Sequence, residues 1–339
     1  MRSIVHDRFG EPSEVLRVTE VPDPAAPGPG EVLIRVTTRP VHPGDLAGIR
    51  GRYTTDHHLP APVTPGMEGV GTVEALGDGI GADSGLTVGG RVAFFPVPGG
   101  WGERVVAPRQ FVTPVPDTVT DVAASQLMVK PITAAMLLRA AEEAGLSADS
   151  GLLVQTAAGS GVGRLVTAMA LSRGFATVSV VRSATGAAVL RETFDVPVLS
   201  TDDNNWVARL REAAGSRPVQ VAVDPIGGAI SVELTGLLAD GGTLLTYGGL
   251  AEGEPMGLDA MTLTSRGLTV RGVTIGRWLI SASEALRGQD IDGALKLAQE
   301  RPDLFDGAAE YDLAHVTDAV QHMERSGKTG TVLLSSPSA

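Results

Sequence analysis

The chain has 339 residues, of which 43% are hydrophobic and 4% aromatic, a composition typical of a folded protein with two domains of ordinary size. A formal net charge of −12 disfavours nucleic acid and anionic membranes as partners. The absence of cysteine excludes disulfides, thiol catalysis, and zinc or iron–sulfur sites with cysteine ligands.

The first third of the chain has the pattern of short β-strands. Alternating or β-branched runs, separated by turns rich in proline and glycine, occur at residues 15–21, 31–38, 70–76 and 102–107. Short strands with such turns predict a partly open β-barrel. A long segment, residues 42–69, lies between the second and third runs. We expect it to contact the substrate, because long loops on a rigid scaffold commonly carry such contacts.

After Pro116 the pattern changes to helices and then to alternating strands and helices. Two helices are predicted first, at residues 121–128 and 131–144. Strands are predicted next at 152–156, 176–181, 196–199, 219–224, 243–247 and 268–275. Helices between them are predicted at 162–173, 187–194, 206–214 and 230–238. Six strands with crossover helices predict a doubly wound parallel sheet of the dinucleotide-binding type.

The end of the chain has a mixed pattern. Helices are predicted at residues 282–286, 291–300 and 316–326, and strands at 309–313 and 331–334. We expect these two closing strands to rejoin the first domain, because the doubly wound sheet already has its six strands.

A turn of small residues joins the strand at 152–156 to the helix after it. Its sequence is Gly159, Ser160, Gly161, Val162 and Gly163, which is not a strict GxGxxG pattern. Glycines at such a turn let the backbone approach a pyrophosphate, and the helix that follows presents unpaired N–H groups to that anion. The alternative is a turn that only packs the helix closely on the strand.

The second strand of this unit ends at Arg182, about twenty residues after the glycine turn, where dinucleotide-binding folds select their cofactor. An acidic residue there would bind the adenosine ribose hydroxyls, whereas a guanidinium can pair with a 2′-phosphate. Ser183 adds a hydrogen-bond donor. These residues favour NADPH over NADH. A surface arginine that merely follows a strand is the alternative.

Motifs along nearly the whole chain resemble those of the zinc-free medium-chain dehydrogenases/reductases, most of all the 2-enoyl thioester reductases and next the quinone oxidoreductases. Residues 155–163 are similar to the enoyl reductases' QNGANSGVG, and Ser160 favours that group over the quinone reductases. The family's VVR, TYGG and RGFW…RW motifs are matched by residues 180–182, 246–250 and 271–278. Residues 49–53 resemble IQGxY, whose tyrosine is regarded in that family as catalytic.

The resemblance implies an α/β protein with two domains. A GroES-like, partly open β-barrel catalytic domain would contain residues 1–122 and 278–339, and a Rossmann NADPH-binding domain residues 123–277. Tyr53 would be the catalytic acid, its alternative being a loop aromatic that shields the cleft. The predicted NADPH site contains Lys130, Thr133, Gly159, Ser160, Gly161, Val162, Gly163, Arg182, Ser183, Tyr247, Gly248, Gly249, Leu250, Val273, Thr274, Ile275 and Lys328.

Lys130 departs from the family pattern, which has an asparagine beside the nicotinamide at this place. It is predicted as a catalytic or cofactor-binding residue, because a lysine could hydrogen-bond the cofactor or place a positive charge near a developing enolate. The alternative is a lysine at a helix start that buries only its stem.

Two further motifs differ from the family pattern, and a residue of the second bears on zinc binding. The family's NPSD stands here as residues 42–45, beginning with His42, and its GNEG as residues 66–69. Met67 occupies the place of the histidine that binds zinc in the alcohol dehydrogenases, so no metal is expected. The pair His57 and His58 is interpreted as solvated loop residues.

Together these observations predict NADPH-dependent reduction of a carbon–carbon double bond conjugated to a carbonyl in a small molecule, foremost a 2-enoyl thioester. The alternatives are an NADPH:quinone oxidoreductase and an NADPH-binding protein without catalysis. The family's edge pairing implies a homodimer through residues 268–275. We expect a cytoplasmic protein, because no apolar signal region follows Met1 and no apolar run approaches about 18 residues.

Overall fold

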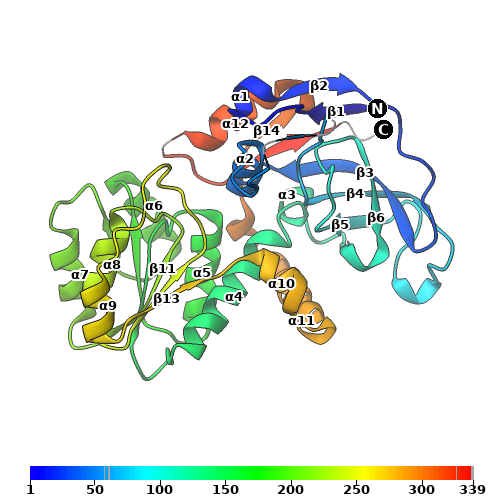
Figure 1. The fold of residues 1–339 in the computed structure, drawn as a ribbon. Helices are drawn as coiled ribbons and strands as arrows, with labels where there is room; N and C mark the ends of the chain where they lie inside the picture. The colour runs from blue at the N-terminus through cyan, green and yellow to red at the C-terminus, as the bar shows by residue number, and fades with distance from the viewer. Residues whose placement is uncertain (57, 60–61, 326, 337–339) are drawn as a thin grey trace. The chain divides into compact units, whose positions relative to one another are not determined.

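The computed structural model describes residues 1–56, 58–59, 62–325 and 327–336, and its contacts divide the chain into two units (Figure 1). Unit 1 contains Met1–Val129 and Ile291–Ala339, and unit 2 contains Lys130–Asp290. The sequence predicted a return to the first domain at residue 278. The stretch up to residue 290 groups with unit 2 because Asp290 accepts hydrogen bonds from Arg139 (2.6 Å) and from Trp278 (2.7 Å).

Unit 1 contains a seven-stranded sheet with β3 (Glu31–Pro40) near its middle. This strand pairs antiparallel with β4 (Gly69–Leu76), β6 (Arg104–Pro108) and β15 (Thr331–Ser335). The order is β14-β15-β3-β4-β5-β7, with β6 also on β3. The other strands are β5 (Arg91–Phe94), β7 (Val112–Pro114) and β14 (Gly307–Asp312). The β15–β3 pairing confirms that the closing strands return to the first sheet.

One face of β3 lies in the core of unit 1. Val32, Ile34 and Val36 are fully buried and alternate with half-buried residues, the pattern of a strand with one face packed. Two more strands, β1 (Arg2–Val5) and β2 (Arg17–Glu20), form a separate ladder. The helices of unit 1 are α1 (Pro12–Val15), α2 (Pro43–Ile49), α3 (Asp121–Ala124) and α12 (Val316–Glu324), with 3₁₀ turns at Ala82–Ser84, Arg109–Phe111, Pro302–Phe305 and Leu313–His315.

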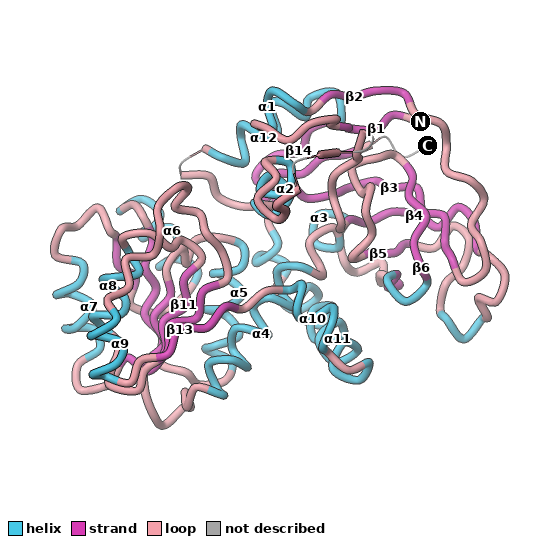
Figure 2. The backbone as a smooth tube through the Cα atoms, viewed as in Figure 1, coloured by secondary structure: helices cyan, strands magenta, loops and turns pink. Residues whose placement is uncertain are grey.

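Unit 2 is a six-stranded parallel sheet with helices on both faces (Figure 2). The strand order is β10-β9-β8-β11-β12-β13, which is the 3-2-1-4-5-6 order of the doubly wound dinucleotide fold. The strands are β8 (Leu152–Gln155), β9 (Thr177–Val181), β10 (Val198–Ser200), β11 (Val219–Asp224), β12 (Thr243–Thr246) and β13 (Thr269–Gly272). All six were predicted, and β11 has the predicted bounds.

The helices of unit 2 include two, carrying Leu210 and Leu234, whose aliphatic side chains are buried in the core of this sheet. The helices of the unit are α4 (Val129–Glu143), α5 (Gly161–Ser172), α6 (Ala184–Thr193), α7 (Trp206–Ala214), α8 (Ile230–Leu237), α9 (Ala260–Arg266) and α10 (Ile275–Ser281), followed by α11 (Glu284–Glu300). In Figure 2, α7, α8 and α9 lie on one side of the sheet and α4 and α5 on the other. Among the described residues, no helix is long and apolar enough to cross a membrane.

Three predictions about the elements were wrong. The strand predicted to reach Ile275 ends at Gly272, because Thr274 begins a helix there and its Oγ1 accepts a hydrogen bond from Gly276 N–H (3.3 Å). The long segment at 42–69 begins with helix α2 rather than a loop, and Pro43 at its first turn is the signal that was missed. The two helices predicted at 282–286 and 291–300 form the single helix α11.

Candidate active site

The glycine turn lies at the carboxyl end of β8, in the middle of the parallel sheet. Ala157 adopts a positive φ of 48°, which bends the chain out of the strand. Ser160 then caps α5, because its Oγ accepts a hydrogen bond from Gly163 N–H (3.1 Å). Gly159 and Ser160 are exposed. The turn that precedes α5 is therefore exposed at the sheet edge where doubly wound folds bind their ligands.

The glycines of this turn differ in the space that surrounds them, and therefore in whether packing requires a glycine. A Cβ at Gly163 would lie 2.6 Å from the carbonyl oxygen of Ala157, so this glycine allows the helix to pack closely on the turn. A Cβ at Gly159 would meet only Val181, at 3.8 Å, an ordinary contact. The packing of the protein alone therefore explains Gly163 and leaves Gly159 without a structural reason. A cradle with free space at Gly159 fits an approaching pyrophosphate.

Lys130 lies against the start of α5. A Cβ at Gly161 would stand 3.0 Å from Lys130 Cδ and 3.2 Å from its Nζ, so the lysine side chain fills the place beside this glycine. Val162 follows in the first turn, and Thr133 is buried one turn further along α4. A lysine ammonium beside a helix N-terminus adds a full positive charge to the partial charge of the helix dipole. This arrangement can bind an anion.

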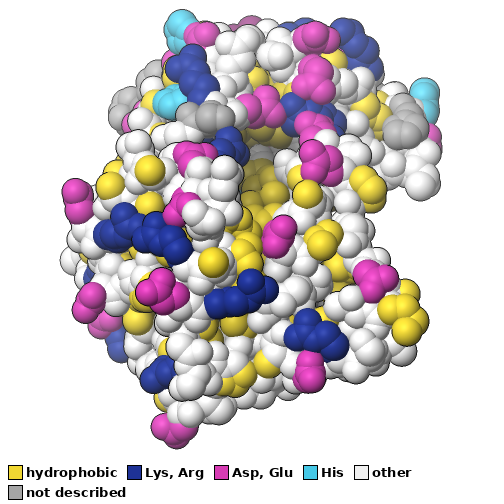
Figure 3. All heavy atoms as spheres, turned by 90° about the vertical axis from the view of Figure 1, so that its left-hand side faces the viewer, with side chains coloured by type: hydrophobic (Ala, Val, Ile, Leu, Met, Phe, Trp, Pro, Cys, Tyr) yellow, Lys and Arg dark blue, Asp and Glu magenta, His cyan; other side chains and the backbone are white. Residues whose placement is uncertain are grey.

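Arg182 and Ser183 follow directly after β9, which pairs with β8. Arg182 is exposed, and Ser183 caps α6 because its Oγ accepts a hydrogen bond from Gly186 N–H (3.1 Å). The Ser183 hydroxyl can still donate its own proton. Acidic and basic side chains are interspersed on the face drawn in Figure 3, so an exposed arginine is not by itself unusual on this surface.

The loop after β12 is joined to the glycine turn by a side-chain contact. The Tyr247 hydroxyl is hydrogen-bonded to Ser160, and burial raises the pKa of Tyr247 well above its ordinary value, against the opposing effect of that bond. Gly248, Gly249 and Leu250 are exposed. The structure therefore brings together the predicted residues of two loops that lie almost ninety positions apart in the sequence.

Asp224 supports the same edge and was not predicted as a functional residue. It is fully buried at the end of β11, and its carboxylate accepts hydrogen bonds from the Thr156 hydroxyl and from Gly227 N–H (2.8 Å). It thereby ties the turn after β8 to the turn after β11. A strand that ends in an aspartate before a Pro-Ile-Gly-Gly turn is the sequence signal for this role.

The remaining predicted cofactor residues lie in different elements. Val273 is buried and its N–H donates to the carbonyl oxygen of Thr246 (2.8 Å), which continues the edge of the sheet. Thr274 caps α10 and Ile275 begins it, so both lie in a helix start rather than a strand. Lys328 belongs to unit 1, where its Nζ donates to the Gly330 carbonyl (3.1 Å) and burial lowers its pKa.

Tyr53, the predicted acid, follows α2 in unit 1 and is 75% exposed. Its ring lies along the glycines of this helix, because a Cβ at Gly44 would stand 3.6 Å from the hydroxyl and one at Gly48 would stand 3.8 Å from the ring. Partial removal of the phenol from water, and then the Asp45 carboxylate, raise the pKa of Tyr53. The hydroxyl is therefore protonated at neutral pH.

No group of three or more His, Asp or Glu side chains that could hold a metal ion is found in the part of the chain that the structure describes. Met67 is exposed, and His58 is exposed in the loop after Tyr53. His57 lies outside the described residues. Glu68, next to Met67, is buried and was not predicted as a functional residue.

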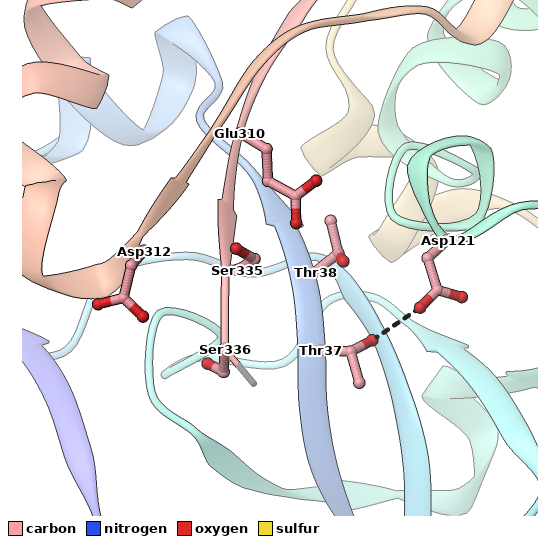
Figure 4. Close-up of a pocket in the computed structure, with 7 residues that line it drawn as sticks. All are labelled: Thr37, Thr38, Asp121, Glu310, Asp312, Ser335 and Ser336. Atoms are coloured by element: carbon pink, nitrogen blue, oxygen red, sulfur yellow. Dashed lines mark hydrogen bonds between the residues drawn. The ribbon is translucent and has the colours of Figure 1, made fainter. Parts of the chain in front are cut away.

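A separate cavity of about 390 Å³ lies in unit 1, and none of the predicted site residues lines it (Figure 4). It is lined by hydroxyl and carboxylate side chains: Thr37, Thr38, Asp121, Glu310, Asp312, Ser335 and Ser336. Thr37 donates a hydrogen bond to Asp121 (3.2 Å), and Arg2 pairs with Asp312 (2.8 Å). Two of the three carboxylates are thus already paired within the protein.

Comparisons with known proteins agree with this architecture. The family model of the alcohol dehydrogenase GroES-like domain matches residues 28–117, and that of the zinc-binding dehydrogenases matches residues 161–292. The mitochondrial enoyl-[acyl-carrier-protein] reductase of Bos taurus is 30% identical over 283 residues, which are 82% of this chain and 73% of that protein.

Two solved structures cover nearly the whole chain. A putative NADPH:quinone reductase from Bacillus thuringiensis superposes with a TM-score of 0.87 at 28% identity, and the match covers 99% of each chain. A mycobacterial protein solved in complex with NADPH has a TM-score of 0.86 at 27% identity, covering 99% of this chain and 100% of that one.

Proposed function

The chain belongs to the medium-chain dehydrogenase/reductase family of oxidoreductases, and from this premise we propose that it uses NADPH to reduce a carbon–carbon double bond conjugated to a carbonyl. The foremost substrate class is a 2-enoyl thioester, carried on coenzyme A or on an acyl carrier protein. The observation that carries the proposal is the open cradle at Gly159, with Lys130 beside it and the Tyr247 loop bonded to it.

The residues of unit 2 fit NADPH. The pyrophosphate would lie at the start of α5, where backbone N–H groups of the helix start, the helix dipole and the Lys130 ammonium all favour an anion. The 2′-phosphate would pair with Arg182, and Ser183 would donate a further hydrogen bond. Thr133 and the Tyr247 to Leu250 loop would hold the nicotinamide. The crystal complex of the mycobacterial relative with NADPH supports this cofactor.

When bound, NADPH supplies the hydride that is added to the carbon β to the carbonyl. The side chains must then stabilise negative charge on the carbonyl oxygen and deliver a proton to the α-carbon. We assign the proton to Tyr53, because a phenol whose pKa is raised remains a donor at neutral and mildly alkaline pH. Backbone N–H groups, Lys130 and Tyr53 are the candidate donors to the oxygen.

Lys130 has two predicted roles, and its position favours one of them. Its side chain runs along Gly161 at the start of α5, which is where a pyrophosphate would lie. We therefore propose cofactor binding as its main role, with stabilisation of an enolate as the alternative. Replacement of Lys130 by methionine would weaken NADPH binding in the first case. In the second it would lower kcat and leave the NADPH affinity unchanged.

An NADPH:quinone oxidoreductase is the second candidate function, favoured by the match to the Bacillus thuringiensis protein. It would use the same cofactor residues but needs no proton donor at a carbon atom. A screen of NADPH oxidation with crotonyl-CoA, longer 2-enoyl-CoAs, simple enones and quinones separates the candidates. Turnover of quinones alone would overturn the first proposal, and NADPH binding without turnover of any acceptor would indicate a binding protein.

We further propose that the reaction needs no zinc, that the protein is a cytoplasmic homodimer, and that neither nucleic acid nor a membrane is a partner. The lack of cysteine and the presence of Met67 at the family's zinc-histidine place support the first point. Strand β13, the edge of the parallel sheet in unit 2, supports the second because an edge strand can pair with a second copy. Size-exclusion chromatography with light scattering tests the oligomeric state.

A further inference from the structure

A buried histidine–glutamate contact lies in unit 1 and is used by none of the roles above. The Glu68 side chain is 1% exposed, and its Oε2 accepts a hydrogen bond from His42 Nε2 at 2.6 Å. Its Oε1 accepts two more, from Met128 N–H at 2.6 Å and from Val129 N–H at 2.9 Å. Both carboxylate oxygens are therefore occupied by protein donors.

The two backbone N–H groups stand at the beginning of α4. The first N–H groups of a helix have no partner within the helix, and an acidic side chain that accepts from them stabilises the helix start through hydrogen bonds and through the dipole. Glu68 supplies this cap from a position sixty residues earlier in the chain. Removal of its carboxylate would leave two N–H donors without their acceptor and would loosen the first turn of α4.

The beginning of α4 carries two residues of the proposed cofactor site. Lys130 directly follows Val129, and Thr133 comes one turn later. The position of the Lys130 side chain against Gly161 depends on where the helix begins, because a helix start that shifts moves all the side chains of its first turn. Glu68 thus acts on the cofactor site through the backbone of α4, without being a residue of that site.

His42 holds the other side of Glu68. It precedes α2, and its own N–H donates to Asp45 (2.9 Å), so the backbone at the start of α2 is fixed. An imidazole at this place reaches the buried carboxylate, and the ring N–H satisfies the oxygen that α4 does not use. The pair therefore links the starts of two helices: α2, against which Tyr53 lies, and α4.

We propose that Glu68 and His42 are positioning residues, which fix the first turn of α4 and through it hold Lys130 in place for NADPH binding. This inference rests on the proposed function, because the readout is the affinity for NADPH. Glu68→Ala is expected to weaken NADPH binding about tenfold, since a small misplacement of binding groups has effects of that order or larger. Glu68→Gln keeps an oxygen for both N–H groups and should bind NADPH within about twofold of wild type.

The decisive experiment is a double-mutant cycle between Glu68→Ala and Lys130→Met, with NADPH affinity measured by fluorescence on the full chain. If Glu68 acts through Lys130, the alanine substitution has little further effect in the Lys130→Met protein. The inference would be overturned if Glu68→Ala weakened NADPH binding as much in the Lys130→Met protein as in the wild type. It would also be overturned if Glu68→Ala alone left the NADPH affinity unchanged. Glu103→Gln is the matched control, because Glu103 is also paired within unit 1, with Arg2 (2.8 Å).

A second pair of variants tests the same idea where Glu68→Ala fails to fold. His42→Ala should weaken NADPH binding by a smaller factor, about threefold, and His42→Gln should restore it, because the amide N–H can reach the carboxylate. Equal affinities of all three proteins would contradict the role of His42. If the wild-type protein itself does not bind NADPH, the proposed function fails. If it binds NADPH but the effects of Glu68→Ala and Lys130→Met on affinity are additive, only the inference about Glu68 fails.

Discussion

The glycine turn and the segment around Tyr53 differ in how firmly the protein holds them. The turn is fixed by the Ser160 cap, by the close approach of Gly163 to the backbone, and by the Tyr247 bond. Tyr53 is largely exposed, and its ring contacts chiefly the glycines of α2. The first region is held at the end of a central strand of the parallel sheet, whereas the second is a largely exposed side chain.

This difference corresponds to the two proposed functions, cofactor binding by the turn and proton donation by Tyr53. A cofactor cradle must keep its shape whatever the substrate, so its residues also carry packing and stability. A residue that meets a variable substrate can be exposed and can contribute nothing to the fold. Substitutions in the turn are therefore expected to change NADPH affinity, at Gly163 together with stability, whereas those at Tyr53 are expected to change catalysis alone.

Tyr53→Phe tests whether Tyr53 acts in catalysis alone, and it has the largest expected effect. Loss of the proton donor should lower kcat for an enoyl thioester by about 10² to 10⁴-fold, the range of general acid catalysis. The melting temperature and the NADPH affinity should stay at wild-type values, because the Tyr53 side chain is largely exposed and is not a residue of the cofactor cradle. Quinone turnover should also stay nearly intact. A loss of stability, or an undiminished kcat with enoyl substrates, would contradict the role of Tyr53 as a proton donor that does not stabilise the fold.

A pair of alanine substitutions separates packing from ligand approach within the turn. Gly163→Ala should lower the free energy of unfolding by about 1–3 kcal/mol, because its Cβ would collide with the backbone at Ala157. Gly159→Ala should change that free energy by less than about 0.5 kcal/mol yet weaken NADPH binding, because its Cβ would occupy the open face of the cradle. Urea unfolding and NADPH titration of both variants give the answer. Equal stabilities, or unchanged NADPH affinity in Gly159→Ala, would count against the cradle.

Arg182→Ala tests the cofactor preference. Loss of a charged partner for the 2′-phosphate should raise the Michaelis constant for NADPH by about tenfold to a hundredfold and leave that for NADH nearly unchanged. Steady-state kinetics with both cofactors measure the ratio. Parallel changes for the two cofactors would mean that Arg182 is a surface residue that merely follows β9.

The smallest effect concerns pH. Because the pKa of Tyr53 is raised above its ordinary value, the phenol stays protonated from neutral pH to about 9, and reduction of the double bond should not fall over that range through loss of this proton. A kcat profile on the wild-type protein checks this expectation. A decline centred near neutral pH would point to a different proton donor.

Much of unit 2 could be predicted because its pattern is local: short strands of three to six residues alternate with helices, and the six strands follow in order. The start of α10 could not, because Val273, Thr274 and Ile275 suit a strand until the cap at Thr274 is seen. Contacts across long sequence distances were also beyond reach. The bond between Ser160 and Tyr247 and the cap that Glu68 gives to α4 depend on the tertiary fold.

Isotope transfer tests whether the protein reduces a conjugated double bond with NADPH. The purified protein is incubated with crotonyl-CoA and NADPH in which both hydrogens on the reactive carbon of the nicotinamide are replaced by deuterium, and the product is examined by mass spectrometry and NMR. We expect butyryl-CoA with deuterium at the β-carbon and a solvent proton at the α-carbon. Unreduced crotonyl-CoA under conditions in which NADPH is bound, or a product without the label, would contradict the proposed function.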